Sequence, residues 1–181
     1  METNVLYTHK ELVEQSKLGD RNSQYKLYEL YVDAMFNISM RMVKIKEDAE
    51  DVVQDGFVEA FNKLDSFKYE STFGSWLKRI IINKSINHLK KRKIALTPIE
   101  DKMYRIKADD ENEKDTPAME IKKVIQGIRL LPAGYQQIIN LYLIEGYDHI
   151  EISEILNITA STSKSQYHRA KKKLIDIINT L

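Results

Sequence analysis

The chain has 181 residues, of which 43% are hydrophobic and 30% are charged, and its net charge is only +1. This length allows one or two small domains, and the near-neutral balance means that a nucleic-acid surface would have to come from local patches. The chain contains no cysteine, which excludes disulfides and thiolate metal sites.

Helical periodicity runs through most of the sequence, and there are only three prolines and six glycines. These features predict an all-α protein. No basic segment followed by an apolar run opens the chain, and no apolar stretch is long enough to span a bilayer. We therefore expect a cytoplasmic protein without membrane insertion.

Residues 8–46 are expected to form two helices, separated by a break at Gly19 and Asp20. Thr8 and Glu11 have the spacing of a capping box at the start of the first helix. The second helix carries an apolar stripe that we expect in the core: Tyr25, Tyr28, Tyr31, Met35, Ile38 and Met42.

The next predicted helix is acidic, with six acids and no base between Glu47 and Glu59. Its apolar residues recur at helical spacing, and a second stripe is formed by Asp48, Asp51, Asp55 and Glu59. Such a stripe is ordinarily a solvated face. We expect no Lys or Arg one turn further along to offset the repulsion between these acids, which favours the hypothesis of a basic partner.

A basic helix follows, with seven bases and no acid between Ser71 and Lys93. A polar stripe along it consists of Arg79, Asn83, Asn87 and Lys90. Amide and guanidinium groups read base edges, and Lys and Arg neutralise phosphates. The alternative is a basic helix end without a ligand.

Five aromatic residues connect the two charged helices or begin the second one: Phe61, Phe67, Tyr69, Phe73 and Trp76. Phe61, Phe73 and Trp76 fit the buried stripes, whereas Phe67 and Tyr69 fit none. We therefore expect Phe67 and Tyr69 to be available for contacts with unstacked bases.

DAEDVVQDGFVEAF followed by STFGSWLKRIIINKSINHLKKRK resembles the polymerase-binding and promoter-melting region of bacterial sigma factors, above all the extracytoplasmic-function (ECF) group. The resemblance implies that the acidic helix docks on a coiled coil of the RNA polymerase clamp through Asp48, Asp51, Gln54 and Asp55. It also implies that the following loop captures a flipped base of the minus-ten element and that the basic helix holds the separated strand. The residues expected there are Phe67, Tyr69, Arg79, Asn83, Asn87 and Lys90.

Periodicity is lost from residue 94 to residue 117, a stretch with four bases and seven acids. We predict a flexible linker over 94–117 between domains at 1–93 and 118–181. A plain tether is the simpler interpretation, and the resemblance implies the alternative of a segment that threads polymerase toward its active-site channel.

The second domain is predicted to contain a helix-turn-helix. A short helix at His149–Leu156 precedes a turn at Asn157 and Ile158, and the last helix begins near Ser161, capped by Thr159 or Ser161. Ile155 to Ile175 contains five bases and no acid.

LPAGYQQIINLYLIEGYDHIEISEILNITASTSKSQYHRAKKKL is similar to the minus-thirty-five-binding domain of the same family. Asn157 replaces the usual Gly of the turn, and Ser161 and Ser163 replace the usual Gly and Val. The resemblance implies contacts with the major groove or its phosphates from Thr162, Lys164, Ser165, His168, Arg169 and Lys171. We assign base reading to Arg169 and a phosphate contact to Lys171.

No catalytic constellation, phosphate loop, metal site or cofactor site is evident, so we expect a protein that is not an enzyme. The leading hypothesis is a sigma factor with core RNA polymerase and promoter DNA as partners, and the resemblance adds an anti-sigma protein. The alternatives are a helix-turn-helix regulator that acts without polymerase and a helical interaction protein. The acidic helix and the aromatic connection with Phe67 and Tyr69 argue against a regulator that acts without polymerase. The two acid-free basic helices argue against a helical interaction protein.

Overall fold

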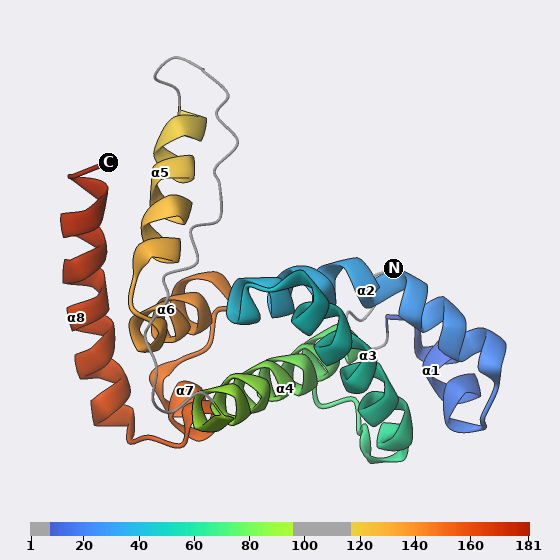
Figure 1. Ribbon diagram of the computed structural model, residues 1–181. Helices are drawn as coiled ribbons and strands as arrows, with labels where there is room; N and C mark the ends of the chain where they lie inside the picture. Colours follow the sequence, from blue (N-terminus) through green and yellow to red (C-terminus); the bar gives the residue numbers. More distant parts are fainter. Residues whose placement is uncertain (1–7, 96–116) are drawn as a thin grey trace, which may run out of the picture. The chain divides into compact units, whose positions relative to one another are not determined.

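The computed structural model describes residues 8–95 and 117–181. Within these ranges all the regular elements are helical, and they form two compact units that we describe separately (Figure 1). The first unit contains α1 (Lys10–Lys17), α2 (Arg21–Val43), α3 (Lys46–Asn62), η2 (Leu64–Ser66) and α4 (Phe73–Ala95). The second contains α5 (Pro117–Leu130), α6 (Ala133–Ile139), η3 (Asn140–Ile144), α7 (His149–Leu156) and α8 (Ala160–Ile178). The prediction of an all-α protein with two helical domains is confirmed.

The predicted linker lies almost entirely outside the described residues, at 96–116. Helix α4 continues past Lys93 to Ala95, and α5 begins at Pro117. Proline suits the first position of a helix, where its missing N–H would have no intrahelical partner.

Helix α2 packs against α1, α3 and α4. The break before it forms where predicted, since Gly19 adopts a φ of 86° that favours glycine. Asp20 then caps α2, and its Oδ2 accepts hydrogen bonds from the backbone N–H of Ser23 at 2.9 Å and from the Ser23 hydroxyl at 2.6 Å.

Two expectations about the first helices are wrong. His9, not Thr8, is the N-cap of α1, and no side chain caps this end. His9 has a left-handed φ of 60°, and its Nδ1 lies 3.0 Å from the Tyr31 hydroxyl, so a tertiary contact has replaced the local capping box. Tyr25 is 61% exposed, because the core side of α2 is set instead by Leu27, which is fully buried.

The apolar faces of α3 and α4 meet in the core of the first unit. The buried apolar side chains from α3 and α4 are Ala49, Val52, Val53, Phe57, Ala60, Phe73, Leu77, Ile81, Ile82 and Ile86. Gly56 of α3 faces Ile81 of α4, where a Cβ would collide with the Ile81 side chain. The buried faces leave the charged stripes of both helices on the outside.

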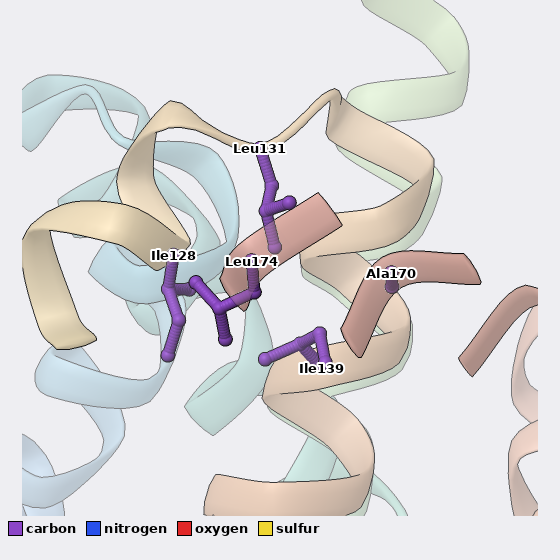
Figure 2. Close-up of a cluster of buried hydrophobic side chains, with 5 residues drawn as sticks. All are labelled: Ile128, Leu131, Ile139, Ala170 and Leu174. Carbon is purple, nitrogen blue, oxygen red and sulfur yellow. The ribbon is translucent and has the colours of Figure 1, made fainter. Parts of the chain in front are cut away.

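A separate core closes the second unit. Figure 2 shows Ile128 and Leu131, from α5 and its end, packed with Ile139 of α6 and with Ala170 and Leu174 of α8. This cluster anchors one side of α8 and leaves its opposite side to solvent. Within the described ranges, no helix is both long and apolar enough to cross a membrane.

Candidate nucleic-acid interface

Glu59, at the end of the acidic stripe on α3, is paired with two bases. Its carboxylate accepts from Lys63 Nζ at 2.7 Å and from Lys84 Nζ at 2.9 Å. These bonds, that of Lys63 foremost, hold the pKa of the Glu59 carboxyl below its usual range. The expectation of an uncompensated stripe is therefore wrong at this end, since Lys63 stands one turn after Glu59.

Asp48, near the beginning of the stripe, is paired with α4. Its Oδ2 lies 3.1 Å from Nη1 of Arg92 and 3.1 Å from Nε2 of His88. The carboxylate is thus engaged within the unit. Of the predicted polymerase-binding residues, Asp48 is the least available to a partner.

Asp51, Gln54 and Asp55 occupy the middle of α3 and are all exposed. Neither aspartate forms an ion pair with any residue that the structure describes. Val58 follows on the same face and is 60% exposed. The ends of the stripe fasten α3 to its surroundings, and the middle presents two free carboxylates beside an apolar side chain.

A groove of about 530 Å³ runs along α4 beside the end of α3. Three residues predicted to contact melted DNA line it, namely Asn83, Asn87 and Lys90, and all three are exposed. Arg79, assigned to the same stripe, is half-buried and lies outside the lining. The structure therefore brings together most of the predicted polar stripe.

The groove also contains residues that the sequence analysis did not assign to DNA. Trp76 and Ile80 contribute apolar surface, and Lys91 contributes charge, whereas Lys84 lines the groove together with its ion-pair partner Glu59. Helical spacing could have identified Trp76 and Ile80 as groove residues, because residues 76, 80, 83, 87 and 90 lie on one face of a helix. Trp76 and Ile80 were missed because apolar residues at helical spacing indicate a core, and here both are only half-buried.

The expectation that Phe67 lies outside the core is wrong. Phe67 is 3% exposed, because the segment after η2 folds back onto the start of α4. Its ring centroid lies 4.7 Å from that of Tyr69, 5.3 Å from that of Trp76 and 6.0 Å from that of Phe73. Tyr69 is half-buried. We call residues 67–72 the aromatic loop.

The helix-turn-helix of the second unit forms through local signals. Asp148 and Glu151 make a capping box at the start of α7, and Asn157 turns the chain after it with a φ of 57°. Thr159 caps α8 by accepting a hydrogen bond from the Thr162 N–H at 3.0 Å. Helix α8 consequently begins at Ala160, next to the predicted start.

The outer side of α8 carries the predicted duplex-contacting residues. Lys164, His168, Arg169 and Lys171 are exposed, and within residues 120–181 none of the three cations forms an ion pair. Ser165 is also exposed, but its hydroxyl donates a hydrogen bond to the Thr162 carbonyl oxygen at 3.0 Å.

Thr162 differs from the other predicted duplex-contacting residues. It is half-buried, and its hydroxyl oxygen lies 2.8 Å from that of Thr159. Its hydroxyl thus belongs to the cap of α8. The cations and His168 therefore dominate what this face presents to solvent.

Ser163, at a position that is usually apolar in the resembled family, is fully buried. Its Oγ lies 2.9 Å from Nδ1 of His149, the first residue of α7. The His149 ring stacks on Tyr142 with centroids 4.6 Å apart, and Tyr142 packs against Tyr167 of α8 at 4.5 Å. A polar partner for the buried hydroxyl thus ties the two helices of the motif together.

Burial lowers the pKa of His149, and the positive charge of Lys164 adds to this effect, while Asp148 opposes it. The neutral form of the His149 imidazole is therefore favoured in the folded protein. Elsewhere among the described residues, no group of acidic and histidine side chains gathers in a way that could hold a metal ion.

Two family matches cover the two units. Residues 27–94 match sigma-70 region 2, and residues 121–174 match sigma-70 region 4. The first match contains α3, the aromatic loop and most of α4, and the second contains α7 and most of α8.

Relatives match almost end to end. The chain is 32% identical over 175 residues to the ECF RNA polymerase sigma factor SigW of Bacillus subtilis, covering 91% of this chain and 94% of SigW. It is 31% identical over 188 residues to the ECF RNA polymerase sigma-E factor of Haemophilus influenzae, covering 96% and 97%. In fold it is similar to the sigma factor RpoE of Bartonella quintana, solved in complex with the anti-sigma factor NepR. The TM-score is 0.60 at 21% identity, and the match covers 86% of this chain and 96% of RpoE.

Proposed function

The chain belongs to the ECF RNA polymerase sigma factors, and we propose that it binds core RNA polymerase, selects promoters and melts the DNA to start transcription. One observation carries the finer part of this proposal: a free acidic surface and a basic groove occupy neighbouring helices of one unit. A regulator that binds only duplex DNA requires neither.

Core polymerase is proposed to bind the exposed middle of α3. Asp51 and Asp55 lack partners within the described residues, so a basic surface would compensate their mutual repulsion. Gln54 adds hydrogen-bonding capacity and Val58 adds apolar area to the same face. Asp48 lies one turn earlier on the same stripe and links α3 to α4 through its pairs with His88 and Arg92.

The α4 groove is proposed to hold the separated strand of the minus-ten element. Lys90 and Lys91 would neutralise phosphates, and the amides of Asn83 and Asn87 would hydrogen-bond to base edges. The Trp76 ring offers the flat apolar surface on which an unstacked base gains about 1–3 kcal/mol. Tyr69, in the adjoining aromatic loop, completes the proposed site.

The exposed side of α8 is proposed to read the minus-thirty-five element as duplex. Its unpaired cations suit phosphates, and an Arg169 guanidinium at mid-helix suits the two acceptors of a guanine in the major groove. His149 and Ser163 would set the angle at which α8 enters that groove.

An anti-sigma protein is proposed as a further partner, supported by the RpoE–NepR complex. Such a protein would inhibit by covering Asp51 and Asp55, because polymerase needs the same surface. Action on core polymerase would place the chain in the cytoplasm.

Reconstitution tests the proposal. Core RNA polymerase is mixed with fragmented genomic DNA of the source bacterium, with and without this protein, and transcript starts are sequenced. We expect a set of starts that share upstream elements and appear only with the protein. Unchanged starts would refute the sigma-factor activity.

Melting is tested on one such promoter by permanganate reactivity of unpaired thymines. Asn83→Ala and Tyr69→Ala are expected to lower the reactivity more than they lower binding to core polymerase. Footprints as strong as those of the wild type with both variants would remove the groove and the loop from the melting step.

A further inference from the structure

A polar cluster joins α1 to the aromatic loop. The Glu14 carboxylate accepts hydrogen bonds from the Tyr69 hydroxyl at 2.7 Å and from Lys17 Nζ at 3.0 Å. Lys17 Nζ also donates to the Phe67 carbonyl oxygen at 3.3 Å and lies 5.1 Å from the centroid of the Tyr69 ring. Two side chains of α1 therefore hold the loop by a hydroxyl, a ring face and a backbone carbonyl.

Tyr69 adopts a backbone conformation that bulky residues rarely have. Its φ is 60°, in the left-handed region. A residue stays in this region only where surrounding contacts impose it, and such positions concentrate at functional sites. Here α1 supplies surrounding contacts through Glu14 and Lys17.

Ring contacts connect this cluster to the α4 groove. The Tyr69 ring packs against Phe67 with centroids 4.7 Å apart, and Phe67 packs against Trp76 at 5.3 Å. Trp76 lines the groove. A displacement of Tyr69 would therefore pass through one buried ring to the wall that faces the proposed DNA strand.

The charges of the cluster are well placed to resist such a displacement. The hydrogen bond from Tyr69, followed by that from Lys17, holds the pKa of the Glu14 carboxyl below its usual range. The carboxylate is thus ionised at neutral pH, and charge-assisted hydrogen bonds are stronger than neutral ones. The Lys17 side chain is 18% exposed and that of Glu14 is 45% exposed, so the pair is partly shielded from water.

We propose that Glu14 and Lys17 are positioning residues for promoter melting, acting through Tyr69 on the wall of the α4 groove. This inference rests on the proposed function of the groove. It extends the melting apparatus to α1, which precedes residues 27–94 and so lies outside the region 2 match.

The test uses the full chain with core polymerase and two forms of one promoter, a duplex and a version with the minus-ten element already unpaired. The variants are Glu14→Gln, Lys17→Met and Tyr69→Phe, which remove charge or a hydroxyl but keep the side-chain volume. Glu11→Gln is the matched control, an exposed carboxylate of the same helix. Opening rates and binding to core polymerase are measured for each.

Each of the three variants is expected to open the duplex about threefold to tenfold more slowly. For Glu14→Gln and Lys17→Met, core binding and use of the unpaired promoter are expected to stay unchanged, whereas Tyr69→Phe, at a residue of the proposed DNA site, is judged on duplex opening alone. The double variant Glu14→Gln/Tyr69→Phe is expected to be no slower than its slower parent, because both changes remove the same bond. The unpaired template separates positioning from a general loss of structure, which would slow both templates.

Duplex opening at the wild-type rate in Glu14→Gln and Tyr69→Phe would overturn the proposal, as would equal losses on both templates in Glu14→Gln and Lys17→Met. Trp76→Ala separates the two possible failures. If it slows opening while Glu14→Gln does not, the role of α1 is wrong and the groove stands. If neither slows opening, both proposals fail.

Discussion

The two units present their charges in opposite ways. In the first unit, carboxylates of α3 are paired with bases of α4, as in Asp48 with Arg92 and Glu59 with Lys84. In the second unit, the cations on α8 form no ion pair within residues 120–181. Internal ion pairs therefore link α3 to α4 in the first unit, whereas the cations of α8 in the second unit remain available to a ligand.

The difference matches the forms of DNA that the two surfaces are proposed to bind. A melted strand has exposed bases, and the first unit offers a groove with Trp76, Ile80 and amides. Duplex DNA is a regular array of phosphates, and a convex helix with unpaired cations suits it. Pairing also determines which charges remain available, since only the middle of the α3 stripe is free to bind a protein.

Charge reversal on α3 should have the largest effect. Asp51→Lys with Asp55→Lys replaces the two free carboxylates, so a basic partner would meet like charges, which costs several kcal/mol. We expect affinity for core polymerase to fall by about a hundredfold or more, at unchanged helix content by circular dichroism.

The matched control reverses two other exposed acids with the same spacing, Glu29→Lys with Asp33→Lys on α2. It makes the same change in net charge. Equal losses in both double variants would mean that overall charge, and not the α3 surface, governs the binding.

Removal of Arg169 should separate base reading from phosphate binding on α8. Arg169→Ala is expected to cost about 1–3 kcal/mol on the promoter and much less on a duplex with a scrambled minus-thirty-five element. Lys171→Ala should weaken both duplexes alike and lower the salt dependence by about one unit. Holoenzyme binding titrated against salt measures both. If Arg169→Ala lowers the affinity for the two duplexes equally, Arg169 makes only an electrostatic contact and does not read a base.

Loss of the Trp76 ring should weaken the groove selectively. Trp76→Ala is expected to cost about 1–3 kcal/mol in the binding of a single-stranded minus-ten oligonucleotide to holoenzyme, with duplex binding through α8 unaffected. Trp76→Phe keeps an aromatic face and should recover most of the loss. If the affinity for the oligonucleotide does not depend on this side chain, the groove binds phosphates without stacking on bases.

The smallest effect concerns pH and His149. The folded pKa of His149 is lowered by burial from the ordinary 6.5, so the unfolded chain binds this proton more strongly than the folded one. This contribution to the free energy of unfolding is complete above 6.5 and decreases as the pH falls from there toward the lowered folded value. The protection factors of the α7 and α8 amides, which correct hydrogen exchange for the intrinsic effect of pH, should therefore decrease on acidification.

His149→Gln should remove this pH dependence, whereas His168→Gln, a change at an exposed histidine of α8, should leave it in place. If the wild type and His149→Gln show the same dependence, other groups cause it. The bond to Ser163 would then act as a structural link without a proton-linked contribution.

Much of the candidate site was predictable because helical periodicity places residues on faces. The stripe Asn83, Asn87 and Lys90 lines the groove, and α8 presents Lys164 and Arg169 to solvent as expected. The error at Phe67 has a clear physical cause. Phe67 was assigned to the surface because it fits neither helical stripe, and a residue in a connection has no period from which burial could be read.

The sequence by itself determined the all-helical class, the order of the two units and the turns that depend on local chemistry. Gly19 with Asp20, Asn157 and Thr159 act within a few residues of themselves, through backbone freedom and capping bonds. Only the tertiary structure decided which charges remain free, where Phe67 goes and how Tyr69 is held. Asp48 and Arg92 are 44 residues apart and Glu14 and Tyr69 are 55 apart, so their contacts depend on how helices pack. A single helical period shows which side of a helix is buried, but it carries no information on what the neighbouring helix presents to that side.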